Sequence, residues 1–160
     1  MQKQNEEDNI NNSNLENKGE IIEDTNEADY SPEIEYEIIK SNIFDMSLKE
    51  LTDFSTQYKN CIFKNYYFIN YTENINIVVK TSDDYKKIET VNIYNNPIIN
   101  KDVISNINVG MTLEEVIKMI GNPIGSFTFG IASLDFSIGR DCIVRIQITD
   151  DLKVVCVNII

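Results

Sequence analysis

The sequence predicts an α+β fold in which two tandem repeats, each a helix followed by antiparallel strands, form one sheet with helices on one face. Two observations support this prediction. A short helix with both ends marked is specified by residues 107–123, and its first turn is repeated 65 residues earlier. After each helix, apolar residues alternate with polar ones, a pattern typical of strands that bury one face.

The helix of the second repeat is expected to begin after Thr112 and to end at Gly121. Thr112 is the predicted N-cap, and Glu115, three residues later, can complete a capping box with it. Gly121 suits a left-handed residue that ends the helix, and Pro123 prevents the helix from resuming. Apolar residues at spacings of three and four predict one buried stripe: Leu113, Val116, Ile117 and Ile120.

The first repeat carries the same signals. Residues 46–51 (M-S-L-K-E-L) align without a gap with residues 111–116 (M-T-L-E-E-V), so Ser47 is expected to cap a helix as Thr112 does. The far ends of the repeats also match, residues 82–93 with residues 149–159. Because both ends agree in the same order, the sequence indicates a tandem duplication.

The strands of each repeat are read from alternation. A turn at Ala132-Ser133 is expected between two of them, and Asp150-Asp151 can form a two-residue hairpin that sets Ile146 opposite Val155. A brief helix is expected at residues 101–106. The predicted strands are 61–72, 75–82 and 87–94 in the first repeat, and 127–131, 134–138, 142–148 and 153–159 in the second.

Charge divides the chain into a tail and a folded part. Residues 1–39 hold 12 acidic and 2 basic residues, whereas residues 40–160 hold 14 acidic and 12 basic. The first segment has no sustained apolar period and is expected to be a disordered acidic tail. Residues 40–96 and 97–160 are then the two repeats, and together they form one domain.

Composition excludes several kinds of chemistry. The chain has no histidine, which removes the commonest general base and zinc ligand. Its three cysteines, Cys61, Cys142 and Cys156, fit no metal spacing and are expected to be buried and apolar in character. No catalytic residue, metal site or cofactor is predicted, and a nearly neutral folded part argues against nucleic acid.

Two acidic pairs have a functional alternative to their structural role. Glu114 and Glu115 resemble a carboxylate pair for acid–base catalysis, but adjacent helix positions point apart and Glu115 is explained by the cap. Asp83-Asp84 and Asp150-Asp151 resemble cation ligands, but aspartates at a hairpin tip need no ion. The structural interpretation is preferred for both pairs.

The chain as given has no apolar stretch long enough to span a membrane and no signal peptide. Two localisations stay open. The protein is either cytoplasmic, or it is the mature part of an exported, lipid-tethered protein of the cell envelope whose leader is missing. The second is slightly favoured, because a long polar tail before a compact domain is typical of tethered proteins.

An aromatic run suggests a binding surface. Because successive strand residues face opposite sides, the aromatic residues between Phe63 and Tyr71 cannot all lie in one core. Some tyrosines are therefore expected on the open face of the sheet, either as ordinary covering or as anchors for a partner. The candidate binding residues are Tyr66, Tyr67, Tyr94, Arg145 and Gln147.

Residues 107–116 (I-N-V-G-M-T-L-E-E-V), followed by Ile120-Gly121 and Pro123, resemble the G-M-T motif of β-lactamase-inhibitor-protein-like domains. The related SmpA/OmlA outer-membrane lipoproteins share this motif. The tandem arrangement looks more like the inhibitor protein, whose two repeats form one concave sheet. This chain departs from the pattern in that Asp45 replaces the first motif glycine and the family's cysteine pairs are missing.

The residues and the resemblance together imply a non-enzymatic protein-binding module that recognises a partner protein on the open face of its sheet. Two other roles stay open. One is a component of envelope assembly, as in the lipoproteins, and the other is a cytosolic inhibitor or immunity-type protein that masks a basic partner.

Overall fold

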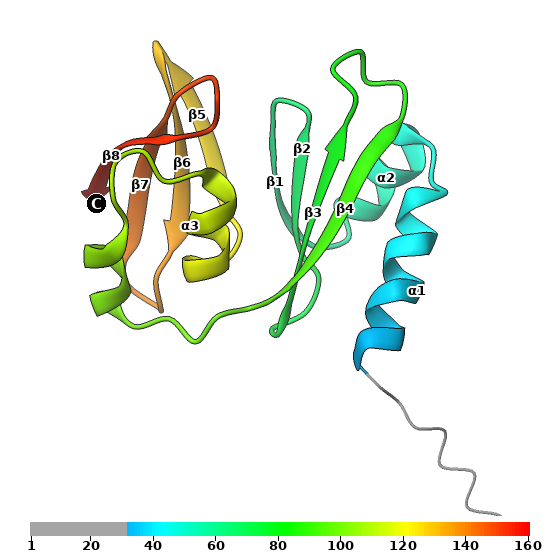
Figure 1. Cartoon of the computed structure of the whole chain (residues 1–160), viewed down its shortest axis with the longest axis horizontal. Coiled ribbons are helices and arrows are strands. Elements are labelled where there is room, and N and C mark those ends of the chain that lie inside the picture. The colour runs from blue at the N-terminus through cyan, green and yellow to red at the C-terminus, as the bar shows by residue number, and fades with distance from the viewer. Residues whose placement is uncertain (1–31) are drawn as a thin grey trace, which may run out of the picture. The chain divides into compact units, whose positions relative to one another are not determined.

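The computed structural model describes residues 32–160 (Figure 1). Most of the predicted tail, residues 1–31, lies outside the described residues. The helical segments are α1 (Pro32–Phe44), α2 (Leu48–Ser55), the 3-10 helix η1 (Lys101–Asn106) and α3 (Leu113–Ile120). The strands are β1 (Lys59–Phe63), β2 (Tyr66–Asn70), β3 (Ile75–Thr81), β4 (Ile88–Asn95), β5 (Gly125–Phe129), β6 (Ile131–Ser137), β7 (Ile143–Ile148) and β8 (Val154–Ile159).

The strands form two four-stranded antiparallel sheets, sheet 1 in the order β1-β2-β3-β4 and sheet 2 in the order β5-β6-β7-β8. The α+β class and the two repeat-like units are therefore confirmed. The prediction of one continuous sheet is wrong. The edge strands β1 and β5 lie close together, and the Ser126 hydroxyl donates to the Ile62 carbonyl at 3.2 Å. No backbone ladder joins these edges in the part of the chain described.

The helices do not all cover the same side of sheet 1. Tyr67 and Phe68 are neighbours on β2, yet Tyr67 packs with α1 and α2, whereas Phe68 packs with α3 and sheet 2. The expectation of helices on one face is therefore wrong. In Figure 1, α3 lies between the two sheets and α1 and α2 lie beyond sheet 1, so the layers are α1/α2, sheet 1, α3 and sheet 2.

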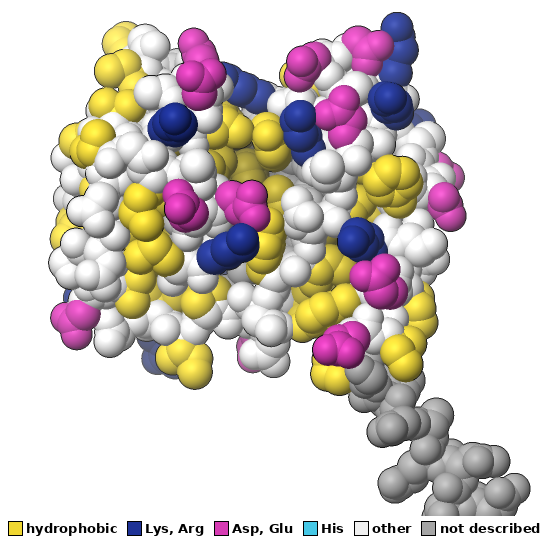
Figure 2. Space-filling model, in the orientation of Figure 1, with side chains coloured by type: hydrophobic (Ala, Val, Ile, Leu, Met, Phe, Trp, Pro, Cys, Tyr) yellow, Lys and Arg dark blue, Asp and Glu magenta, His cyan; other side chains and the backbone are white. Residues whose placement is uncertain are grey.

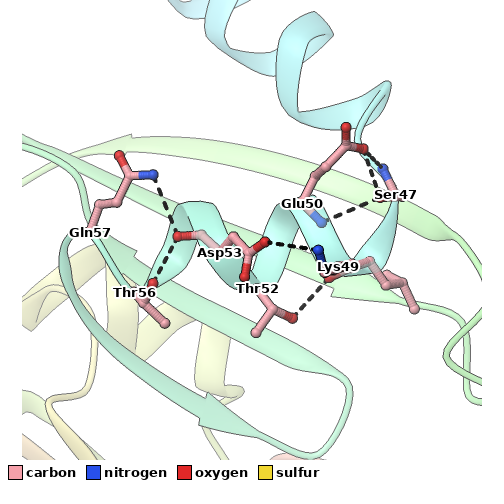
Figure 3. Close-up of polar contacts among 8 residues, drawn as sticks. Ser47, Lys49, Glu50, Thr52, Asp53, Thr56 and Gln57 are labelled. Atoms are coloured by element: carbon pink, nitrogen blue, oxygen red, sulfur yellow. Dashed lines mark hydrogen bonds and ion pairs between the residues drawn. The ribbon is translucent and has the colours of Figure 1, made fainter.

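Both predicted capping boxes are present. The Ser47 hydroxyl accepts from the Glu50 N–H at 3.3 Å, and the Glu50 carboxylate accepts from the Ser47 N–H at 2.8 Å (Figure 3). Thr112 and Glu115 make the same two bonds at 3.2 and 2.7 Å. The predicted apolar stripe of α3 is buried, and α2 buries Leu51.

The predicted turns are partly wrong. Residues 61–72 form two strands, because Lys64 adopts a φ of +51° and turns the chain between β1 and β2. Gly130, with a φ of +79°, makes the β5–β6 turn in place of Ala132-Ser133. The brief helix expected at residues 101–106 is confirmed as η1.

The loop between β7 and β8 is longer than the expected two-residue hairpin. The Leu152 N–H donates to the Thr149 carbonyl, and Leu152 itself has a φ of +59°. A type I turn followed by a left-handed residue makes a three-residue loop with a bulge. The loop shifts the pairing by one residue, so Ile148 lies opposite Val154, and a register shift between Gln147 and Ile148 adds a second. Ile146 therefore lies opposite Val157 rather than Val155.

The boundary of the tail is also corrected. Pro32 opens α1, and a proline is well suited to the first position of a helix because its missing N–H needs no partner there. Ile43 of α1 is buried against sheet 1, and the Tyr36 hydroxyl donates to the side chain of Asn95 on β4. Residues 32–39 therefore belong to the folded part and not to the tail.

Candidate functional site: the open face of the second sheet

Sheet 2 has one face that no described element covers. Its inner face packs against α3 through even-numbered residues of β6 such as Leu134 and Phe136. Strand alternation sends the odd-numbered residues to the other side, which we call the outer face. In sheet 1 the corresponding face, opposite α1 and α2, is covered by α3 and sheet 2. The outer face of sheet 2 therefore corresponds to the face of sheet 1 that the second repeat covers.

Large apolar side chains are exposed on the outer face. Phe129, at the tip of the β5–β6 hairpin, is 99% exposed, and Phe127 and Ile131 are each 51% exposed. Phe129 lies directly opposite Ile131 in the ladder, so both side chains lie on the outer face. Ile143 on β7 is exposed on the same face. Several large apolar side chains exposed on one sheet face indicate an interaction site.

A fixed ion pair lies among these apolar residues. Asp135 and Arg145 are opposite each other on β6 and β7, and the guanidinium donates to both carboxylate oxygens at 2.8 and 2.9 Å. The hydrogen bond to Asp135 raises the pKa of Arg145. The guanidinium carbon lies 4.5 Å from the ring centroid of Phe127. The Asp135 carboxylate and the Phe127 ring therefore hold the guanidinium of Arg145 in one orientation.

The candidate residues chosen from the sequence do not share one face. Arg145 and Gln147 lie on the outer face of sheet 2, as odd-numbered residues of β7. Tyr66 and Tyr94 line a cleft between sheet 1 and α3. Tyr67 is buried against α2, with its hydroxyl 3.3 Å from that of Thr52. The expectation that Tyr94 shares a face with Arg145 and Gln147 is wrong, because the sheets are layered and α3 separates them.

Sequence reasoning missed the apolar residues of the outer face. The alternation of Phe127, Phe129 and Ile131 identifies a strand, but alternation alone does not say which face is buried. The sequence signal that could have revealed this face is a change from odd to even numbering. The apolar residues of β5 have odd numbers, whereas the buried apolar residues of β6 have even numbers. With the turn at Gly130, Phe129 pairs with Ile131 and both side chains lie away from the core.

Other kinds of site find little support between residues 32 and 160. No group of three or more His, Cys, Asp or Glu side chains there is placed to hold a metal ion. Cys61 and Cys142 are buried, and burial raises the pKa of the Cys61 thiol, so it is a poor nucleophile. None of the helices in this range combines the length and apolar character needed to cross a bilayer.

The fold and this face define a small α+β protein of two repeat-like units with one open sheet face. Comparison with family models, curated proteins and solved structures finds no match for the chain.

Proposed function

We propose that this protein is a non-enzymatic binding module that recognises a partner protein through the outer face of sheet 2. The observation that carries the proposal is the group of exposed Phe127, Phe129 and Ile131 beside the oriented Arg145. Aromatic residues and arginine are the types most often found as hot spots in protein interfaces. The likeness of the G-M-T motif to inhibitor-like domains supports the same class of function.

The geometry favours a binding role over a packing role for these residues. Phe129 is exposed at the tip of the β5–β6 hairpin, where strand pairing holds the backbone in place. A rigid aromatic side chain loses little conformational entropy when a partner buries it. Arg145 is already held by Asp135 and Phe127, so it also needs little ordering. The backbone that carries Phe129 and the side chain of Arg145 are therefore in place before a partner arrives.

The partner surface expected from this chemistry is apolar, with an acceptor group for the free edge of the guanidinium. An envelope-assembly role would use the same face, and in that case the partner would be another envelope protein. The two roles differ in the partner and not in the residues that bind it.

The test starts from the full chain as bait in an extract of the source organism, followed by titration of each captured protein. Phe129→Ser is expected to weaken binding about 30-fold, which corresponds to the loss of about 2 kcal/mol at a hot spot. Ile98→Ser is the matched control, because Ile98 is equally exposed but lies in the segment between β4 and η1. Equal affinities for the two variants would overturn the proposal.

A further inference from the structure

A second surface feature lies between the two repeats, away from the outer face. It is a cleft of about 210 Å³ between sheet 1 on one side and α3 with the β7–β8 loop on the other. Figure 2 shows hydrophobic side chains in the hollow between the two halves, with acidic and basic side chains at its rim. The cleft is small, since pockets for drug-sized ligands measure about 300–1,000 Å³.

The walls of this cleft are aromatic. Tyr66 stacks on Phe68 with ring centroids 6.0 Å apart and planes 8° from parallel, and Tyr94 stands beside them on the same face of sheet 1. One of these rings already contacts a cation within the protein. The Lys118 ammonium lies 5.8 Å from the Tyr94 ring centroid. The faces of tyrosine rings attract cations. Burial and the neighbouring Glu114 raise the pKa of Tyr94 to about 12, so its phenol stays neutral.

Two carboxylates line the cleft, and only one of them forms an ion pair. Glu114 pairs with Lys118 at 2.8 Å, and near the cleft Lys64 pairs with Asp150 at 2.9 Å and Lys80 with Glu89 at 3.0 Å. Asp151, which lines the cleft from the β7–β8 loop, forms no ion pair with any described residue. The aromatic walls therefore meet one carboxylate that no described side chain holds in an ion pair.

We infer that this cleft binds one basic side chain of a partner polypeptide, with its cation between Tyr66, Tyr94 and Asp151. The volume fits a single long side chain better than a cofactor. Arginine suits the site best, because its planar guanidinium stacks on aromatic rings and bonds to a carboxylate in the same plane. This site is separate from the outer face of sheet 2 and does not depend on the function proposed for that face.

The experiment is an NMR titration of the full, isotopically labelled chain with N-acetyl-arginine methylamide. The expected result is saturable shifts at Tyr66, Tyr94 and Asp151, with a dissociation constant in the range of about 1 mM. The citrulline analogue has nearly the same shape without the charge, and it is expected to cause no saturable shift. Equal binding of the two probes, or shifts outside the cleft alone, would overturn the inference.

Two variants localise the binding. Asp151→Asn removes the charge and is expected to weaken arginine binding about tenfold, whereas Asp84→Asn, at the matching position of the first repeat, is expected to leave it unchanged. Asp151→Lys places a cation at the rim and is expected to abolish binding. The spectra of the variants show directly whether each is folded. If Asp151→Lys folds and still binds the arginine probe, the cleft is not the site.

Discussion

At the scale of single residues, the contact between the repeats depends on the turn that follows α3. The Asn122 side chain is buried and donates to the carbonyls of Ile69 and Ile77, on two neighbouring strands of sheet 1. The chain reaches this position through Gly121, whose φ of +82° and ψ of −171° are accessible almost solely to glycine. A Cβ at Gly121 would lie 2.9 Å from the side-chain oxygen of Asn96.

Gly121→Ala is therefore expected to lower the free energy of unfolding by about 1–3 kcal/mol, through backbone strain and this close contact. Gly125→Ala is the control, since Gly125 has no positive φ and a Cβ there meets its nearest atom at an ordinary 3.9 Å. Urea unfolding of both variants measures the difference. If the two variants unfold at the same urea concentration, Gly121 does not set the contact between the repeats.

At the scale of elements, the two capped helices are the parts that the sequence specifies most clearly. The hydroxyls of Ser47 and Thr112 each accept from the N–H three residues on. Ser47→Ala and Thr112→Ala are each expected to lower the free energy of unfolding by about 1 kcal/mol, the usual contribution of an N-cap. Thr56→Ala, at the other end of α2, is a control that leaves both N-caps intact. If Ser47→Ala and Thr112→Ala are both silent, the caps contribute nothing to stability.

The same caps predict a dependence of stability on pH. Hydrogen bonds from Ser47 lower the pKa of Glu50, and hydrogen bonds from Thr112 lower the pKa of Glu115. A carboxyl with a lowered folded-state pKa stabilises the fold above its unfolded pKa of about 4.3, and this stabilisation disappears as the pH falls through the folded-state pKa.

The double variant Glu50→Gln, Glu115→Gln is therefore expected to lose less stability than the wild type when the pH is lowered from about 6 to about 3. Glutamine keeps an acceptor at each cap but does not ionise. The measurement is the urea midpoint at several pH values. Glu73→Gln, which alters an exposed glutamate that caps no helix, is compared with each single variant, Glu50→Gln and Glu115→Gln, as a control for the loss of one negative charge. If the urea midpoints of the wild type and the double variant fall equally as the pH is lowered, the predicted contribution of the two caps to the pH dependence is contradicted.

The first helix tests where the folded part begins. Ile43 is 1% exposed and packs on sheet 1, whereas Ile38 in the same helix is 55% exposed. Ile43→Ala is expected to destabilise the protein by about 2–5 kcal/mol. Ile38→Ala should change stability by about 0.5 kcal/mol or less. Thermal or urea unfolding distinguishes them, and equal effects would mean that α1 is not part of the folded core.

At the scale of the whole molecule, local signals predicted the elements and failed to predict how the repeats meet. The capping boxes and the apolar stripe from Leu113 to Ile120 involve residues that are only a few positions apart, so they can be recognised directly in the sequence. Whether sheets join edge to edge or stack depends on residues far apart, such as the contact of Asn122 with β2 and β3. Nothing local marks Asn122 as a residue that bridges two strands.

The candidate site was predicted in part for the same reason. Arg145 and Gln147 were assigned correctly to the face of sheet 2 that lies away from α3. Tyr66 and Tyr67 were both named as candidates, but as consecutive residues of β2 they face opposite sides. Because Lys64 turns the chain between β1 and β2, Tyr67 is the one that faces α2. A lysine with a positive φ has no clear sequence signal, since glycine and asparagine are the usual residues there. One unrecognised turn therefore changed which tyrosines face a core.

The most direct test of the central claim, that the outer face of sheet 2 binds a partner protein, is site-specific photocrosslinking in the source organism. A photoreactive phenylalanine analogue replaces Phe129 on the outer face or, in separate proteins, Ile98 between β4 and η1 and Phe44 on α1, all of which are exposed. The account predicts a discrete crosslinked protein from position 129, with none from positions 98 and 44. Crosslinks from position 98 or 44 but not from position 129 would contradict it.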